Sequence, residues 1–467
     1  MKFHYSIIFV LMFSSFIGSF AQIDRKNPPK GDPPSVIRIS KPQVFRLKNG
    51  LTVLCVEDHK YPVVRLSLAF DRDPLSQGDK AGIKDIFGEM LRSGTKKHTK
   101  EQFDEEIDQM GTSLYSSFSR IYLSSLKRYF VPSLALMNEM VLEPRFDNTQ
   151  EFKKLIKRSL TKLEMSEKDP EAVSARVRNK LYYGNHPYAE YASDESLKNI
   201  QLKDFRVFYE KFFGPEEAYL TFVGDITKEE AYKLAEEYFS NWKTHPISSK
   251  KYQLPLPLSA IEIDMVDLPS STQAVINVGA PVNFKKSSPD YFSASLANRI
   301  LGGGSQGRLF LNLREDKGYT YGAYSSLIPN KDIGSFRAGA QVRTEVVALA
   351  VEEFLKEIRR IKEPIEEKEL TSFKNEMSGN FVLALEDPQS AARFIVEEFT
   401  ESLSENFYQN YLKSLQSVTA SEVTQAAKKY ISDHLRVLVV GDLQKIMPSI
   451  KKMGYPVHLF DKFGQPL

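Results

Sequence analysis

Hydrophobic and polar residues alternate along several short segments near the start of the chain. The dipeptide Asn49-Gly50 stands between Val44–Leu47 and Leu51–Val56, and this arrangement predicts a β-hairpin with a two-residue turn. Every second residue of Val64–Phe70 is apolar, which predicts a strand with one buried face. From Ala81 to about Leu91 the apolar residues follow a helical period. We therefore expect strands followed by a helix in this region.

Strand and helix patterns continue to follow one another in clusters through the first half of the chain. Thr99, followed by Gln102 and Phe103, predicts a second helix with a capped start. Met110–Leu126 returns to a strand-like alternation, and long helical segments follow to about Phe239. Clusters of strands and clusters of helices are typical of an α+β domain.

The second half of the chain repeats this order. Phe336–Val342 alternates as a strand, and we expect Thr344 to cap the helix that follows it. The apolar residues of that helix recur at spacings of three and four, which predicts that one face is buried. They are Val347, Val351, Phe354, Leu355, Ile358 and Ile361.

Two short matches fix the length of the repeat. Leu220–Asp225 and Val437–Asp442 are apolar runs that both end in Gly-Asp, and they lie 217 residues apart. Asp169-Pro170 returns as Asp387-Pro388 after 218 residues. Two matches at nearly one offset predict two similar domains of ~200 residues each. The predicted boundaries are residues 43–247 for the first domain, 248–258 for a linker and 259–467 for the second domain.

The first residues of the chain have the pattern of a signal peptide. Lys2 precedes an apolar run from Ile7 to Phe20, and Ser19 and Ala21 provide the small residues of a cleavage site. The run is shorter than the ~20 residues that span a bilayer. We expect a signal peptide at residues 1–21 and an extended leader at 22–42. The mature chain is then exported to the periplasm or secreted, with no membrane span.

Composition and charge exclude several other classes of protein. The 467 residues are 42% hydrophobic and 26% charged, as in a soluble globular protein. The 63 Lys and Arg residues nearly balance the 60 Asp and Glu residues, so we expect no nucleic-acid partner. A single cysteine, Cys55, excludes an internal disulfide. The seven histidines are scattered, and no two are spaced as a helical zinc-binding pair.

Three groups of residues occur in the order that is found in one known family. They are Gly82–Thr95; His186-Pro187-Tyr188 with Phe208–Phe213 and Gly224-Asp225; and Gly302–Phe310 with Leu313-Arg314-Glu315 and Gly318–Tyr321. With them, the chain resembles the pitrilysin/insulinase-type zinc peptidases from Val44 to about Phe460. The resemblance implies an α+β fold of two similar domains, each a mostly antiparallel sheet packed with helices. Together the two domains would form one half of a clamshell peptidase.

The resemblance also shows that the catalytic zinc motif is missing. Active members carry His-x-x-Glu-His on a helix and a further Glu downstream. The matching positions here are Asp85, Gly88, Glu89 and Lys162, so both histidine ligands, the general base and the third ligand are replaced. Asp85 and Glu89 could hold a hard cation through oxygen, but solvated surface carboxylates are the simpler interpretation. We expect no metal and no cofactor in this chain, with zinc in a partner subunit.

A second feature of the family, a substrate-contacting pair of Arg and Tyr seven residues apart, is kept as Arg314 and Tyr321. A guanidinium and a phenol can both donate hydrogen bonds to a peptide carbonyl and to the oxyanion that forms from it. The resemblance therefore implies a catalytic role for the pair in trans. Without the resemblance, a surface ion pair and an ordinary strand tyrosine would explain these two residues.

These features predict the non-catalytic, substrate-binding subunit of an exported heterodimeric zinc metallopeptidase. Its partners would be a homologous zinc-bearing subunit and an extended or unfolded peptide. As an enzyme, the chain would be inactive alone and active only within the heterodimer. The alternative is a non-enzymatic peptide-binding or scaffold protein of the same fold. A third hypothesis, an independent metallopeptidase with an atypical site, requires a metal in this chain.

Overall fold

The structure is a computed structural model that describes residues 43–244, 252 and 256–467, apart from the side chains of Pro388 and Ala391. The predicted signal peptide, the leader and most of the predicted linker lie outside these residues. Among the residues that the structure describes, no helix is both long and apolar enough to cross a membrane.

The first half contains a six-stranded mixed sheet whose strands lie in the order β1-β2-β6-β3-β5-β4. Only β2 and β6 run parallel, and the other neighbours are antiparallel. The strands are β1 (Gln43–Arg46), β2 (Thr52–Glu57), β3 (Val63–Phe70), β4 (Ser113–Ser116), β5 (Arg120–Leu126) and β6 (Ala218–Gly224).

Helices of the first half share one apolar core with this sheet. Phe87 and Phe205 lie at its centre, each with no exposed surface. The capping box predicted for the second helix is present, because the Thr99 side chain accepts a hydrogen bond from the backbone N–H of Gln102. The helices are α2 (Ile83–Leu91), α3 (Lys100–Gln109), α4 (Lys127–Leu142), α5 (Thr149–Ser166), α7 (Asp194–Asn199), α8 (Leu202–Phe212) and α9 (Lys228–Phe239).

The second half contains another six-stranded mixed sheet, in the order β12-β7-β11-β8-β10-β9. Its strands are β7 (Glu262–Asp267), β8 (Gln273–Val282), β9 (Thr320–Ile328), β10 (Gly334–Arg343), β11 (Arg436–Gly441) and β12 (Val457–Phe460). Its helices are α10 (Tyr291–Gly302), α11 (Arg308–Phe310), the π-helix η3 (Leu311–Asp316), α12 (Val347–Arg360), α13 (Glu367–Ala384), α15 (Tyr411–Ser417), α16 (Ala420–Tyr430) and α17 (Leu443–Lys451). This architecture confirms the predicted α+β fold.

The two sheets correspond strand by strand. The two runs that end in Gly-Asp form β6 and β11, which both take the third place in their sheets. Arg120 of β5 lies opposite Ala69, and Arg337 of β10 lies opposite Gly279 of the matching strand. Arg120 and Arg337 therefore occupy the same register position in the two sheets, and they are also 217 residues apart.

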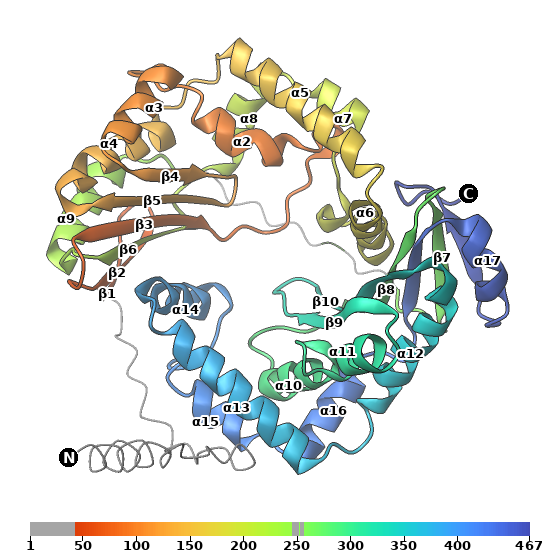
Figure 1. Cartoon of the computed structure of the whole chain (residues 1–467). Coiled ribbons are helices and arrows are strands. Elements are labelled where there is room, and N and C mark those ends of the chain that lie inside the picture. The colour runs from red at the N-terminus through yellow and green to blue at the C-terminus, as the bar shows by residue number, and fades with distance from the viewer. Residues whose placement is uncertain (1–42, 245–251, 253–255) are drawn as a thin grey trace, which may run out of the picture. The chain divides into compact units, whose positions relative to one another are not determined.

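Each half gives one helix to the sheet of the other half (Figure 1). Helix α6 (Pro170–Tyr183) packs Val173 and Val177 against valines and a leucine of the second sheet. Helix α14 (Pro388–Thr400) packs Ala392 against the first sheet, where it meets β2 and β6. The repeated Asp-Pro pairs begin these helices, and each aspartate caps the start by accepting a backbone N–H.

Two local predictions were wrong. The hairpin turn between β1 and β2 is centred on Lys48 and Asn49, since the N–H of Gly50 donates to the carbonyl of Leu47 at 3.0 Å. Gly50 follows the turn at a φ of 94°. Thr344 does not cap α12, which begins at Val347. Its hydroxyl donates to the carbonyl of Thr272 at 3.0 Å, so a tertiary contact replaces the local cap.

Candidate functional site

The degenerate zinc motif lies where the resemblance places it, on α2. This helix buries one face, which includes Ile83 and Phe87, and leaves Asp85 exposed and Glu89 partly exposed on the other. Helix α5 lies alongside and brings basic residues to these carboxylates. Arg158 of α5 forms an ion pair with Glu89.

Asp85 lies beside Lys162, the residue at the position of the family's third ligand. Crowding by protein atoms raises the pKa of the Asp85 carboxyl, while Lys162 and Lys84 oppose that shift. Lys162 and Arg158 also line an open groove on α5 together with Lys154 and Lys157. The surroundings of the motif are therefore rich in positive charge, which disfavours a cation there.

Gly88, at the position of the general base, is buried against the backbone of the neighbouring hairpin. A Cβ atom at Gly88 would lie 2.2 Å from the carbonyl oxygen of Ser116 and 2.5 Å from the Cα of Ser117. The hydroxyl of Ser116 donates to the Gly88 carbonyl at 2.7 Å and holds this contact. The helix therefore has no room for a glutamate at this position.

These residues do not fit the zinc that the family implies. Of the four positions, Glu89 is engaged by Arg158, Lys162 is a cation, and Gly88 has no space for a side chain. Within the described residues, no group of three or more His, Cys, Asp or Glu side chains is arranged to hold a metal ion. His98 is engaged by Glu139 and Glu106 instead.

Arg314 and Tyr321 are brought together by η3 and the start of β9. The Arg314 guanidinium donates to the backbone carbonyl of Tyr321 at 2.8 Å and lies 4.8 Å from the centre of the Phe310 ring. It also forms a 3.4 Å ion pair with its neighbour Glu315. The guanidinium thus fixes the backbone of Tyr321, while the phenol remains free of it. The role of the pair in catalysis stays a prediction.

A β-bulge turns the Tyr321 side chain outward. Ala323 pairs with Ala340 and Thr320 pairs with Val342, so two residues of β9 face the single residue Gln341 of β10. Such an extra residue re-aims a side chain. In a regular strand Tyr321 would share the face of buried Ala323, yet it is 86% exposed.

The glycine-rich loop brings α10 and α11 close to β9. A Cβ atom at Gly302 would lie 2.7 Å from the backbone nitrogen of Ser325, and one at Gly307 would lie 2.8 Å from the Cα of Gly302. The loop therefore allows the close backbone approach that the sequence indicated. This packing sets the position of η3, and hence of Arg314, relative to β9.

A cavity of about 570 Å³ lies between α6 and the second sheet. We call it the α6 cavity, and Tyr321 stands among the residues that line it. Two arginines, Arg178 of α6 and Arg337 of β10, also face it, as do Glu171 and Asn277. The sequence analysis missed both arginines. The offset of the repeat was the available signal for Arg337, because it also relates this residue to Arg120.

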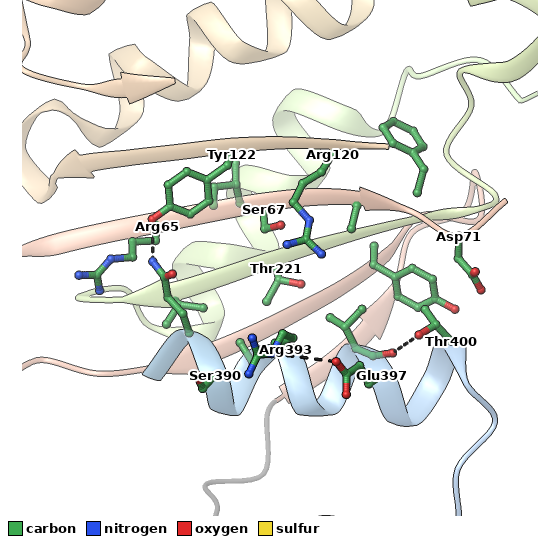
Figure 2. A pocket seen from close by; sticks show the side chains of 18 of the residues that line it. Arg65, Ser67, Asp71, Arg120, Tyr122, Thr221, Ser390, Arg393, Glu397 and Thr400 are labelled. Atoms are coloured by element: carbon green, nitrogen blue, oxygen red, sulfur yellow. Dashed lines mark hydrogen bonds and ion pairs between the residues drawn. The ribbon is translucent and has the colours of Figure 1, made fainter. Parts of the chain in front are cut away.

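A corresponding cavity of about 360 Å³, the α14 cavity, lies between α14 and the first sheet. Figure 2 shows Arg120 reaching from β5 into this space, with Arg393 and Glu397 on the facing helix. Gln389 of α14 donates to the hydroxyl of Tyr122 at 2.6 Å and ties the helix to the sheet. The same architecture therefore produces a cavity beneath each exchanged helix.

Comparisons with known proteins agree with this geometry. Residues 52–193 match the family described as Insulinase (Peptidase family M16), and residues 199–377 match the Peptidase M16 inactive domain. A non-peptidase homolog, YmxG, from Helicobacter pylori is 25% identical, over 86% of this chain and 92% of its own. An uncharacterized zinc protease from Rickettsia bellii is 23% identical, over 85% of this chain and 97% of its own.

Solved structures share the fold. The crystal structure of a peptidase M16 inactive domain from Pseudomonas fluorescens has a TM-score of 0.78 and 24% identity, and covers 86% of this chain and 98% of its own. A protease from Helicobacter pylori has a TM-score of 0.77 and 19% identity, over 86% of this chain and 99% of its own. With the two family matches and a zinc motif that has lost its ligands and its base, the chain belongs to the M16 insulinase family as a non-catalytic member.

Proposed function

We propose that this chain is the substrate-binding subunit of a heterodimeric zinc metallopeptidase. The observation that carries the proposal is the contrast between the two parts of the family's active site. The α2 position has no room for a catalytic glutamate at Gly88. In contrast, the second half presents an exposed Tyr321 phenol on a bulge that Arg314 holds in place. A homologous chain with an intact His-x-x-Glu-His motif would be the partner.

The substrate would be an extended or unfolded peptide that binds along β9. This strand is at the edge of its sheet, and among the described residues it pairs only with β10. An extended peptide can add to such an edge through main-chain hydrogen bonds. Tyr321 near the start of the strand would then lie next to the peptide backbone.

In the closed complex, Tyr321 and Arg314 would act on the peptide carbonyl that the partner attacks. The phenol donates a hydrogen bond to the carbonyl oxygen, which becomes negative as the tetrahedral intermediate forms. The guanidinium holds the Tyr321 carbonyl and so positions the phenol; its remaining N–H groups can donate to the same oxygen. Both residues would matter more for the transition state than for peptide affinity.

The test is reconstitution with a zinc-bearing M16 chain from the same organism. The mature chain and the partner are mixed, complex formation is followed by gel filtration, and cleavage of an unstructured peptide is measured. Tyr321→Phe should lower kcat while the complex still forms. The matched control is Tyr61→Phe, because Tyr61 is also a well-exposed tyrosine, at 71%, and lies in the first half between β2 and β3.

Unchanged cleavage by Tyr321→Phe within an intact complex would reject the catalytic role. The alternative function, a non-enzymatic peptide-binding or scaffold protein, would then be favoured. The printed name of the Helicobacter pylori relative, a non-peptidase homolog, supports that alternative. A complex that forms but cleaves no peptide at all would also favour it.

We also propose that the mature chain is exported, to the periplasm or out of the cell. This rests on the signal-peptide pattern of residues 1–21 alone. Fractionation of cells that produce the chain, with N-terminal sequencing of the exported form, tests it. A mature form that begins near Gln22 in the exported fraction is the expected result, and an unprocessed chain retained in the cytoplasm would contradict it.

A further inference from the structure

Two arginines face each other's charge in the α6 cavity without a carboxylate partner. Arg178 donates to the side chain of Asn179 at 3.1 Å, and no ion pair joins it to any described residue. Among the described residues, no hydrogen bond or ion pair engages the Arg337 side chain. Burial lowers the pKa of Arg178, and the nearby charge of Arg337 lowers it further. Two cations are therefore held together at an electrostatic cost.

Other partly buried arginines of the second half are paired with acids. Arg308 donates two hydrogen bonds to Glu369, at 2.9 and 2.6 Å. Arg436 donates to the buried Asp264 at 2.8 Å. The fold thus supplies carboxylates to arginines that serve its stability, and the pair in the α6 cavity differs from them.

The only acidic residue that lines the α6 cavity is Glu171, near the start of α6. Burial raises the pKa of its carboxyl, and Asp169 raises it further, while Arg178 lowers it. Arg178, Arg337 and Glu171 leave the lining with an excess of one positive charge. The described cavity is therefore suited to a ligand that brings one negative charge.

The floor of the cavity is kept low by a residue without a side chain. Gly339 follows Arg337 at the next position on the same face of β10, and a Cβ atom there would lie 2.6 Å from the carbonyl oxygen of Ile276. The volume of about 570 Å³ can accept a peptide side chain with part of its backbone. Tyr321 and β9 line the same space, so a peptide on the β9 edge has direct access to the arginines.

We propose that Arg178 and Arg337 form a carboxylate-binding subsite in the α6 cavity for an extended peptide that lies along β9. The inference rests on the proposed function and defines its substrate class as peptides with a carboxylate close to the Tyr321 contact. Two planar guanidinium groups match the two oxygens of a carboxylate, which each can bind as a fork. The carboxylate can come from an acidic side chain or from the C-terminus of the peptide.

The α14 cavity provides an internal comparison. Arg120 occupies there the register position of Arg337, and Arg65 and Arg393 also line the space. Four acidic residues line it too, so its charges have opposite partners within the cavity. They are Asp71, Asp387, Glu397 and Glu401. A carboxylate should therefore prefer the α6 cavity, and Arg120 is the matched control position.

The experiment measures peptide affinity of the full mature chain by fluorescence anisotropy. Three unstructured peptides carry the same uncharged dye: one has a central Glu and an amidated C-terminus, one has Gln in its place with the amide, and one has Gln with a free C-terminus. We expect the Glu peptide, the free-acid peptide or both to bind roughly 10- to 100-fold more tightly than the neutral one, as for hydrogen bonds to a charged group. The two charged arms distinguish the source of the carboxylate.

Arg337→Gln and Arg178→Gln should each remove most of this preference and leave the affinity for the neutral peptide unchanged. Arg337→Lys keeps the charge but not the fork, and should retain only part of the preference. Arg120→Gln should keep it in full. Thermal unfolding of each variant verifies that the chain is folded, and the lysine variant retains the test if the glutamine variant does not fold.

Three results would overturn the subsite. The first is equal affinity of the wild-type chain for all three peptides, which leaves the proposed peptide-binding function intact. The second is an equal loss of preference in Arg120→Gln, which would place the effect in general charge. The third is the absence of binding of any of the three peptides to the wild-type chain, which would reject the proposed function together with the subsite.

Discussion

Gly88 offers the sharpest test of why this chain lost its catalytic site. The perturbation is the smallest possible one, Gly88→Ala. In a helix interior alanine is more stable than glycine by about 1 kcal/mol, so propensity alone predicts stabilisation. The structure predicts the opposite sign, because the new Cβ would lie 2.2 Å from the Ser116 carbonyl oxygen.

The magnitude follows from what must move. The contacts are with backbone atoms of Ser116 and Ser117, which cannot rotate away as a flexible side chain can. Forcing one extra carbon into a packed site costs about 1–3 kcal/mol. The hydrogen bond from Ser116 to the Gly88 carbonyl, worth about 1 kcal/mol, is strained as the strand shifts. After the gain in propensity, we expect a net loss of about 1–3 kcal/mol.

Gly379→Ala is the matched control. Gly379 lies inside helix α13, is exposed, and has no atom within 4 Å of the position of a new Cβ. This variant should gain stability, by up to about 1 kcal/mol. Urea unfolding followed by circular dichroism measures both changes as shifts of the midpoint. A midpoint for Gly88→Ala that equals or exceeds that of Gly379→Ala would refute the steric reasoning.

Three further predictions follow from the same contacts. Tyr321→Phe should lower kcat of the reconstituted heterodimer by roughly 100- to 1,000-fold, as for the loss of one oxyanion donor, and Arg314→Lys should also lower it because an ammonium lacks the planar fork; steady-state kinetics with the intact complex checks both. Restoring the zinc motif should fail to yield stoichiometric zinc by metal analysis and should destabilise the chain, since Glu cannot fit at the second position of Asp85→His, Gly88→Glu, Glu89→His and Lys162→Glu. Burial acts to raise the pKa of the Glu139 carboxyl, but hydrogen bonds from Thr95, His98 and the Lys97 N–H outweigh it and lower the pKa. This contribution to stability is complete above the ordinary Glu pKa and is lost as the pH falls through the lowered value, so urea midpoints between pH 6 and pH 3 should fall less steeply for Glu139→Gln, and equal slopes would contradict the assignment.

The sequence by itself determined the local elements and their repetition. Alternation and helical spacing predicted β3, β10 and the buried face of α12, because these patterns depend only on neighbouring residues. The Asp-Pro pairs predicted a second copy of the domain, and in the structure each pair starts a helix. The missing histidines at Asp85 and Glu89 identified a chain without a zinc site. All of these inferences rest on residues close together in the sequence.

The tertiary structure alone decided which sheet each helix covers and what fills the space beneath it. Nothing in the spacing of Val173 and Val177 tells that they pack on the other half's sheet. The bulge that exposes Tyr321 depends on its pairing with β10, and the position of Thr344 depends on a carbonyl 72 residues away. The arginine pair of the α6 cavity comes from segments far apart in the chain, Arg178 from α6 and Arg337 from β10. Periodicity reports how a segment is buried but not what buries it, so contacts between distant segments are decided only when the chain folds.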